Sequence, residues 1–549
     1  MTHHIILKIL GPFLLLYALV LTIPMILAGY YQFFANPADY PQPPATGAFA
    51  LTMLTCICLA IPCIILSRKD RSNLHRRDAL IISVLIWFLT PAIGALPFIF
   101  SGTVQRFDQA YLESVSGFST TGVSTFEAKQ FDPQTGVEIP IKKTTYGIQE
   151  NSYEFYGNIN PVTNSHTGEL LIGLEAVNRA ILFWRNFTEW LGGIGIIVLF
   201  VAFLPALGVE GKFLFQTEMP GLEKTGFTPR IKETALQLLK IYVGLTFIQT
   251  VLLLLTNSKM GWLDAITISF STLSTGGMTI HPNSIAYYNN IHTEWITLVF
   301  MILAGINFTL YYHVLKGKIF RLFDQEFILY LVLLIVFGVF TTSILVGQPQ
   351  INLLNENLGV YSFFGAIRHG FFQIVSALTS TGLYTTNYET WPMVLQALIL
   401  IAMFLGAMSG STSGGIKLIR VYMLFQITKY KIESIFRPKT VKILRIGQRE
   451  LDSNTIMTVQ CFLFLVLLFF VMGTFVFILD NIDSETSLSL SVSLVTNTGF
   501  GFGLNGPAGS LAFLSPLPSY FSSFLMILGR LEYFAVLALF LPAFWKENT

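Results

Sequence analysis

Four short stretches carry the residues of this sequence that could do chemistry, and all four combine hydroxyl side chains with glycine. In each, a serine lies six residues before the last glycine and a second hydroxyl lies three residues before it. The stretches are SGFSTTGV (116–123), STLSTGGM (271–278), SALTSTGL (376–383) and SLVTNTGF (493–500). Because glycine adopts left-handed backbone angles, neighbouring carbonyls can turn toward a common axis. Four such loops around one axis would offer a ring of oxygen ligands that replaces the hydration shell of an ion.

The elements that must position these loops follow from their surroundings. Each stretch ends an apolar, hydroxyl-rich segment of about 12 residues, which is too short to cross a bilayer. We interpret each segment as a re-entrant helix whose C-terminal end, with its partial negative charge, favours a cation. The alternative is that glycine and hydroxyl residues merely permit close helix packing. Packing alone does not explain why all four stretches have their serine, hydroxyl residue and glycine at the same spacing.

The composition indicates a membrane protein. Of the 549 residues, 53% are hydrophobic and 12% are charged, whereas a soluble domain carries about 25% charged residues. This excludes a cytosolic enzyme, a disordered chain and a secreted disulfide scaffold, and the four cysteines form no metal-binding pattern. We therefore predict an all-α polytopic membrane protein with ten spans, near 9–32, 46–66, 79–101, 187–208, 241–258, 295–315, 327–347, 391–416, 455–479 and 519–545.

The distribution of charge predicts the orientation. Lys and Arg gather in the loops 68–77, 212–240, 316–321 and 417–449, whereas 33–47 and 481–518 contain none. The positive-inside bias then places both termini in the cytoplasm. The net charge of +2 says little about partners, and no nucleic-acid partner is expected. No HExxH or GxSxG motif is present, so we expect neither an enzyme nor a nucleotide bound to this chain.

The eighth span is interrupted by AMSGSTSGGIK (407–417). Glycine disfavours helix by about 1 kcal/mol per residue, and hydroxyl side chains offer the backbone alternative hydrogen bonds. Two interpretations are possible: this segment is a loop that switches conformation at modest free-energy cost, or it is a helix kinked by glycine. The residues concerned are Gly410, Ser411, Thr412, Ser413, Gly414 and Gly415.

Several charged residues lie within or beside the predicted spans. Arg530 lies in the middle of the last span, where such a residue usually faces the interior of the bundle. We expect Glu532, which does not share its helix face, to bond a neighbouring repeat. Arg185 reads as an interfacial anchor, as does Lys417. Glu113 is expected near a helix N-terminus or at the mouth of the pore.

These residues resemble the pore loops of the superfamily of K⁺ transporters that includes the Trk, Ktr and plant HKT proteins, most closely the TrkH/TrkG-type potassium-translocating subunit. The resemblance covers nearly the whole chain. It is carried also by GLEAVNRAILFWRNFTEWLGGIGIIVL (173–199), EMPGLEKTGFTPRIKETA (218–235), LAGINFTLYYHVL (303–315), GSTSGGIKLIR (410–420) and MILGRLEYFAVLALFLP (526–542).

The resemblance implies four helix–pore loop–helix repeats in a pseudo-fourfold arrangement behind two N-terminal transmembrane helices. The two N-terminal helices would occupy 1–76. The four repeats would occupy 77–211, with an extracellular insertion at 124–178, and then 212–324, 325–449 and 450–549. It also implies K⁺ as the transported ion, with Thr120, Thr121, Gly122, Thr275, Gly276, Gly277, Ser380, Thr381, Gly382, Asn497, Thr498 and Gly499 as the filter. K⁺ itself is expected at Thr121, Gly122, Gly276, Gly277, Thr381, Gly382, Thr498 and Gly499.

The resemblance implies more about regulation and assembly. A gating loop would lie at 410–415 under the filter, with Arg530 close to the pore as a barrier, a holder of the loop, or a bond to the ends of the pore helices. Homodimers in a bacterial inner membrane are expected, with a cytoplasmic nucleotide-binding Trk regulatory subunit at 212–240 and 417–449. The alternatives are a Na⁺-permeable or Na⁺-coupled transporter of the same fold and, in another class, an intramembrane enzyme.

The first outer loop departs from the family. Residues 124–178 are rich in Asn, Thr, Gly and Tyr, and the corresponding segment of the family is much shorter. Two interpretations stay open, a small β-rich cap over the entrance and a mobile loop.

Overall fold

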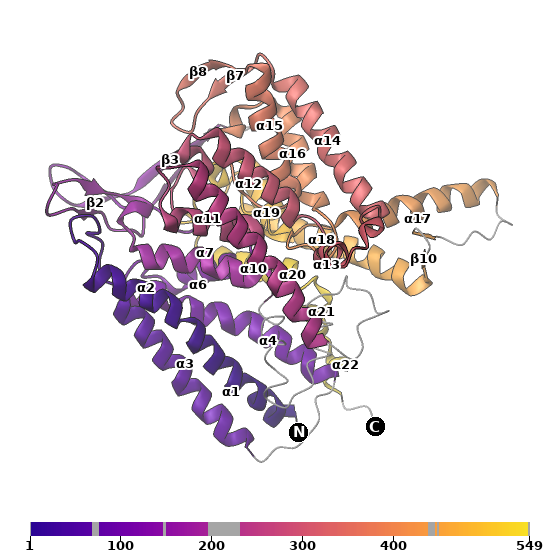
Figure 1. The fold of residues 1–549 in the computed structure, drawn as a ribbon, viewed down its shortest axis with the longest axis horizontal. Helices are drawn as coiled ribbons and strands as arrows, with labels where there is room; N and C mark the ends of the chain where they lie inside the picture. Colours follow the sequence, from indigo (N-terminus) through magenta and orange to yellow (C-terminus); the bar gives the residue numbers. More distant parts are fainter. Residues whose placement is uncertain are drawn as a thin grey trace.

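The computed structural model describes residues 2–68, 76–146, 150–195, 231–437, 445–446 and 449–546. At the N-terminus, α1 (Thr2–Val20) continues almost directly into α2 (Thr22–Phe33), and α3 (Thr46–Ser67) returns beside α1. These helices, indigo to violet in Figure 1, lie along one side of the molecule, while α17 extends from the opposite side. They correspond to the two predicted N-terminal spans.

Four groups of helices follow, called here repeats one to four, and each contains a long outer helix, a short helix and an inner helix. The outer helices are α4 (Arg76–Gly94) with α5 (Leu96–Phe100), α10 (Ile231–Thr256), α14 (Gln325–Leu345) and α18 (Ser453–Leu479). The short helices are α6 (Phe107–Phe118), α11 (Trp262–Ser274), α15 (Phe363–Leu378) and α19 (Ser484–Thr496). The inner helices are α7 (Arg179–Gly193), α12 (Ile291–Ala304), α16 (Met393–Leu405) and α20 (Pro516–Arg530).

Further helical segments follow the inner helices or lie in loops. They are α13 (Phe308–Leu315), α17 (Leu418–Phe436), α21 (Phe534–Ala538), α22 (Pro542–Trp545), η1 (Gly173–Ala176), η3 (Ser284–Tyr288), η4 (Ile319–Leu322), η5 (Tyr388–Thr390) and η6 (Gly503–Asn505). Two small hairpins lie outside the first repeat. They pair β7 (Pro349–Ile351) with β8 (Asn357–Val360), and β9 (Arg445–Ile446) with β10 (Arg449–Glu450).

The outer helices expose large apolar side chains, as a membrane protein requires. Leu255 on α10 is 77% exposed, and Phe464 on α18 is 64% exposed. In water, such contiguous apolar surface would be unusual, whereas lipid solvates it. Among the described residues, six helices are long and apolar enough to cross a bilayer, or seven if α12 and α13, which meet at 91°, form one span. The chain is therefore a polytopic helical membrane protein.

The prediction of ten spans needs one correction, because the inner helices are not continuous. Breaks occur after Ala304 and Leu405, and α20 ends at Arg530 in the middle of the predicted tenth span. The sequence predicts a break only in the eighth span. The fourth span also begins earlier than 187, because the Asn178 side chain accepts the Ala180 N–H at 2.9 Å and caps α7 there. Residues 196–208 of that span lie outside the described residues.

The insertion at 124–178 is a β-rich cap, so the first of its two interpretations is correct. Three antiparallel hairpins pair β1 (Gln130–Phe131) with β2 (Glu138–Ile139), β3 (Ile141–Tyr146) with β4 (Glu150–Phe155), and β5 (Val162–Thr163) with β6 (Leu170–Leu171). The cap packs on repeat four through Phe155 against Phe513. The Tyr153 hydroxyl donates to Asp483 at 2.9 Å, at the start of α19. These contacts tie the cap to the pore helix of repeat four.

Candidate functional site

The backbone takes one conformation in all four glycine stretches. Each short helix ends three or four residues before the last glycine of its stretch, and the chain then turns through two left-handed residues. The glycines have φ of 86° (Gly122), 93° (Gly277), 81° (Gly382) and 90° (Gly499). The residues two before them have φ of 54° (Thr120), 57° (Thr275), 53° (Ser380) and 53° (Asn497).

The left-handed glycines agree with the sequence prediction, but the left-handed residues before them were missed. A β-branched residue such as Thr120 or Thr275 rarely adopts positive φ. Such strain persists where the surrounding structure holds it in place, and it is common at functional sites. The available sequence signal was Asn497, since Asn tolerates the left-handed region better than most residues.

The four glycines close a ring. A Cβ on Gly122 would overlap the Gly276 carbonyl oxygen of the next repeat, and a Cβ on Gly277 would overlap the Thr381 carbonyl oxygen. Going round, a Cβ on Gly382 would lie 2.6 Å from the Thr498 oxygen, and one on Gly499 would overlap the Thr121 oxygen. Each glycine thus packs on the carbonyl that precedes the glycine of the adjacent repeat, and any side chain at these positions would push the repeats apart.

A shared set of hydrogen bonds holds each loop against its own short helix. The N–H of the residue before each glycine donates to the carbonyl of the serine six residues before the glycine, at 2.8–2.9 Å in every repeat. In repeats one, three and four the hydroxyls three and one residues before the glycine also pair, as in Ser119 with Thr121 at 2.7 Å. The recurring hydroxyls of the sequence motif are therefore explained as bonds that fix the loop.

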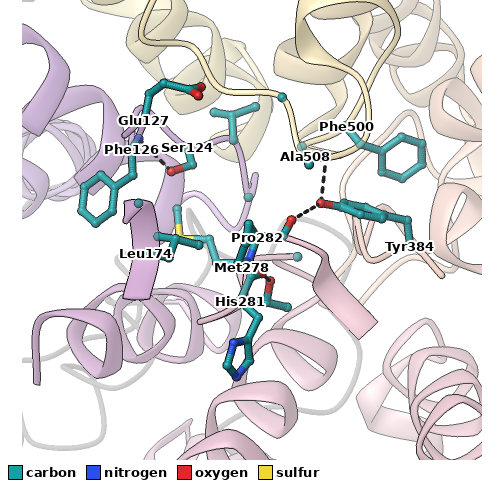
Figure 2. Close-up of a pocket in the computed structure, with 18 of the residues that line it drawn as sticks. Ser124, Phe126, Glu127, Leu174, Met278, His281, Pro282, Tyr384, Phe500 and Ala508 are labelled. Atoms are coloured by element: carbon teal, nitrogen blue, oxygen red, sulfur yellow. Dashed lines mark hydrogen bonds between the residues drawn. The ribbon is translucent and has the colours of Figure 1, made fainter. Parts of the chain in front are cut away.

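A cavity of about 280 Å³ lies on the side of the ring from which the chain leaves each glycine, and all four ring glycines line it. Figure 2 shows Tyr384 reaching across this cavity. Its hydroxyl donates to the Pro282 carbonyl at 2.8 Å and accepts the Ala508 N–H at 2.9 Å. Repeats two, three and four are thereby joined above the ring. Glu127, at the start of the cap, lines the same cavity.

On the opposite side, the segment 406–417 lies directly under the ring. It is non-helical between α16 and α17, with positive φ at Gly406, Gly410 and Gly415. Its contacts reach the ends of the short helices. The Thr412 hydroxyl donates to the Leu273 carbonyl at 3.0 Å, and the Gly415 N–H donates to the Thr496 carbonyl at 3.0 Å.

Two more contacts bring this loop to the remaining repeats. The Gly414 N–H donates to the Ser380 hydroxyl at 2.5 Å. The Arg530 guanidinium donates to the Thr412 carbonyl at 3.0 Å and to the Thr120 hydroxyl at 3.1 Å. All four repeats therefore contact the loop, directly or through Arg530. The loop fills the position immediately beneath the ring.

Arg530 has more partners than the sequence could indicate. Besides Thr412 and Thr120, it donates to the carbonyls of Gly192 at 2.6 Å and Gly193 at 3.2 Å, where α7 ends. The partial negative charge of a helix C-terminus favours a cation there. The structure thus combines two of the expected arrangements, contact with the loop and bonds to helix ends, except that the bonded carbonyls belong to an inner helix.

Other charged residues differ from their interpretation as membrane anchors. Arg185 is 2% exposed and bonds Glu113, which lies in the middle of α6 rather than at its start. Lys417 is half-buried and donates to Ser413 in the loop. The expected bond from Glu532 to another repeat is present, because Arg420 donates to Glu532 at 2.5 Å.

The remaining predicted interaction sites are only partly described. Residues 212–230 and most of 438–449, the basic loops expected to meet a regulatory subunit, lie outside the described residues. Among the residues that are described, no group of three or more His, Cys, Asp or Glu side chains could hold a metal ion.

Comparison with known proteins gives a consistent result. The family model TrkH, a cation transport protein, matches residues 138–547. The Trk system potassium uptake protein TrkH of Salmonella typhimurium is 31% identical over 505 residues, which are 91% of this chain and 92% of the relative. TrkH of Halomonas elongata is 30% identical over 557 residues and 100% of both chains. The crystal structure of the potassium transporter TrkH from Vibrio parahaemolyticus matches with a TM-score of 0.76 at 27% identity, over 100% of both chains. This chain belongs to the TrkH family of cation transport proteins.

Proposed function

We propose that the chain takes up K⁺ through the ring of four glycine loops. The observation that carries this proposal is the closure of the ring, in which every glycine lies against the carbonyl of the adjacent repeat. Carbonyl rings replace the water around a dehydrated cation. The ligands are the predicted ones, supplied by the carbonyls of Thr121, Gly122, Gly276, Gly277, Thr381, Gly382, Thr498 and Gly499. The other filter residues, Thr120, Thr275, Ser380 and Asn497, provide the left-handed turn.

The loop of Gly410, Ser411, Thr412, Ser413, Gly414 and Gly415 acts as the gate in this proposal, together with Arg530. Its support is position and composition. The loop lies beneath the ring with bonds to several repeats, and its glycines allow rearrangement at modest cost. Because Arg530 brings a positive charge to the loop and to Thr120, it raises a barrier to cations below the ring and holds the loop closed.

The chain is expected to work in the inner membrane of a bacterium with both termini in the cytoplasm, on the basis of its alternating basic loops. Its repeats are divided as 77–211, 212–324, 325–449 and 450–549 behind the two N-terminal helices of 1–76. A homodimer and a cytoplasmic nucleotide-binding Trk regulatory subunit complete the proposal. K⁺ is cargo, and the membrane potential drives it inward with about 2.3 kcal/mol per charge per 100 mV.

The test is rescue of a bacterium that lacks K⁺ uptake systems. The full chain, produced with and without a Trk regulatory subunit, is expected to restore growth at low external K⁺ and to mediate K⁺ uptake measured directly in the same cells. Uptake of Na⁺ at a comparable rate would favour the Na⁺-permeable alternative. If the protein is shown to be in the membrane but takes up no cation, the proposed transport function is contradicted and the alternative of an intramembrane enzyme is favoured.

A further inference from the structure

Repeat two departs from the other three at the residue before its ring glycine. Thr121, Thr381 and Thr498 each supply a hydroxyl that pairs with a second hydroxyl two residues earlier, at 2.7–2.8 Å. Repeat two has Gly276 at this position, so this pair cannot form there. Ser274 instead donates to the Ser271 carbonyl of its own helix at 3.2 Å.

The space left by the missing side chain of Gly276 is occupied by Glu189 of α7, in repeat one. A Cβ on Gly276 would lie 2.5 Å from the Glu189 Cδ and 2.6 Å from its Oε1. The φ of Gly276 is not in the left-handed region, so this angle does not require glycine there. The carboxyl group of Glu189 is thus the contact that excludes a side chain there.

The residue after the ring glycine is also held differently in repeat two. In repeats one and three, the serine six residues before the glycine donates to the carbonyl of this residue at 2.6 Å. In repeat two that residue is Met278, and both of its backbone groups are held by α7. Its N–H donates to Glu189 Oε1 at 2.9 Å, and its carbonyl accepts from Asn186 Nδ2 at 2.6 Å.

Both α7 side chains are fully buried, with 0% exposure. Hydrogen bonds in such low-dielectric surroundings are strong and fix geometry, and a buried partner left without its bond is costly. Glu189 and Asn186 therefore hold Met278 by hydrogen bonds, and Glu189 also packs against Gly276, whose carbonyl is the one against which Gly122 packs. A shift of this segment would move one quarter of the ring.

We propose that Glu189 and Asn186 form a brace from repeat one, and that in repeat two this brace takes the place of the hydroxyl pair found in the other three repeats. We propose further that the brace sets the K⁺/Na⁺ discrimination of the ring. They are positioning residues, because they act through the backbone of residues 276–278 rather than on the ion. This inference rests on the proposed K⁺ uptake and identifies residues outside the glycine motif that determine selectivity.

The structure offers a reciprocal pair of variants as the test. Glu189→Ala removes the glutamate half of the brace and leaves the bond from Asn186 to Met278, and Gly276→Thr places a side chain against the carboxyl group. The double variant removes the obstacle and gives residue 276 a hydroxyl that can pair with Ser274, as Thr121 pairs with Ser119. Uptake of K⁺ and of Na⁺ is measured for the full chain in the uptake-deficient bacterium, with the half-saturating concentration and the maximal rate determined separately.

Each single variant is expected to lower the ratio of K⁺ to Na⁺ uptake on the order of tenfold, the effect of one lost buried hydrogen bond. The half-saturating K⁺ concentration is expected to rise more than the maximal rate falls, and the double variant should recover most of the ratio. An unchanged ratio in Glu189→Ala, or a double variant no better than the worse single variant, would overturn the brace.

A matched control is Glu294→Gln. Glu294 is also a buried carboxyl on an inner helix, but it bonds Arg368 rather than a ring loop, so its variant should keep the wild-type ratio. If Glu189→Ala does not reach the membrane, Gly276→Ser probes the same contact from the loop, with loss of the ratio expected and an unchanged ratio contradictory. Failure of the wild-type chain to take up K⁺ would instead refute the proposed function.

Discussion

The guanidinium of Arg185 and the carboxylate of Glu113 form an ion pair inside the protein, with Nε and Oε1 2.6 Å apart and the two side chains 2% and 0% exposed. Arg185 also donates to the Thr279 carbonyl at 3.2 Å and to the Ser124 hydroxyl at 3.0 Å. The pair thus joins α6 and α7 of repeat one to the loop that follows the ring in repeat two.

Replacing one partner of this pair should be strongly destabilising, because it leaves an uncompensated buried charge. Arg185→Met is expected to cost about 3–5 kcal/mol of stability, whereas Arg185→Met combined with Glu113→Gln should recover part of the loss, because the amide carries no charge and its oxygen can still accept the Thr125 N–H. Thermal unfolding of the purified protein in detergent measures both. A double variant as unstable as the single one would show that the charge on Glu113 is not the cause.

Gly122→Ser should relax the discrimination between K⁺ and Na⁺. A Cβ there meets the Gly276 carbonyl of the next repeat, so the ring must widen or distort to accommodate it. Relative uptake of the two ions is the measurement. Gly136→Ser is the matched control, since Gly136 also has a left-handed φ of 67° but no atom near its Cβ position. Equal uptake ratios in Gly122→Ser and wild type would remove Gly122 from the filter.

Loosening the loop beneath the ring should raise the basal ion flux. Thr412→Val removes the donor to the Leu273 carbonyl while roughly keeping the side-chain volume, and shortening residues 409–415 removes the obstruction itself. Flux in proteoliposomes without a regulatory subunit is compared with that of Thr297→Val, a buried hydroxyl on α12 without a hydrogen-bond partner among the described residues. A shortened protein that folds and keeps wild-type flux and gating would show that this loop is not the gate.

Substitutions of Arg530 separate its charge from its hydrogen bonds. Arg530→Gln should increase both single-channel current and open probability, because the barrier and the bonds to Thr412 and Gly192 are lost together. Arg530→Lys keeps the charge but not the forked donor geometry, so its current should stay near wild type while its open probability rises. Currents and open probabilities identical to wild type in Arg530→Gln would exclude both roles.

The stability of the protein should depend on pH through Glu389 in the outer loop before α16. Burial raises the pKa of Glu389 from 4.5 to about 7, although the bond that its Oε1 accepts from the Gly503 N–H at 2.7 Å opposes this shift. Between these two pH values the folded protein holds a proton that the unfolded chain has released. The free energy of unfolding therefore falls as pH rises across this range.

Glu389→Gln tests this dependence, because the amide can still accept the Gly503 N–H but does not titrate. Relative to wild type, the variant should be more stable at pH 8, by at most on the order of 3 kcal/mol, and this advantage should vanish near pH 4. Thermal unfolding at a series of pH values provides the comparison. A constant difference at all pH values would contradict the raised pKa.

The sequence by itself determined the membrane class, the four glycine stretches and the interruption of the eighth span, because these depend on local properties. Apolar length sets a span, a segment of about 12 residues cannot cross, and glycine permits left-handed φ at positions such as Gly122. The break at 406–417 was visible for the same reason. The alternation of basic loops likewise predicted an orientation without any knowledge of packing.

Only the tertiary structure decided which distant side chains meet. Arg185 lies just before the predicted fourth span, 187–208, and Glu189 lies near its start, so both look like polar residues at the edge of a membrane helix. In the structure both are buried: Arg185 pairs with Glu113 on α6 of the same repeat, and Glu189 accepts the Met278 N–H of repeat two. Contacts between segments far apart in the chain decide which side chains are buried, which partner each charge has and what occupies the space beside Gly276. The spacing of residues along the sequence does not reveal these contacts.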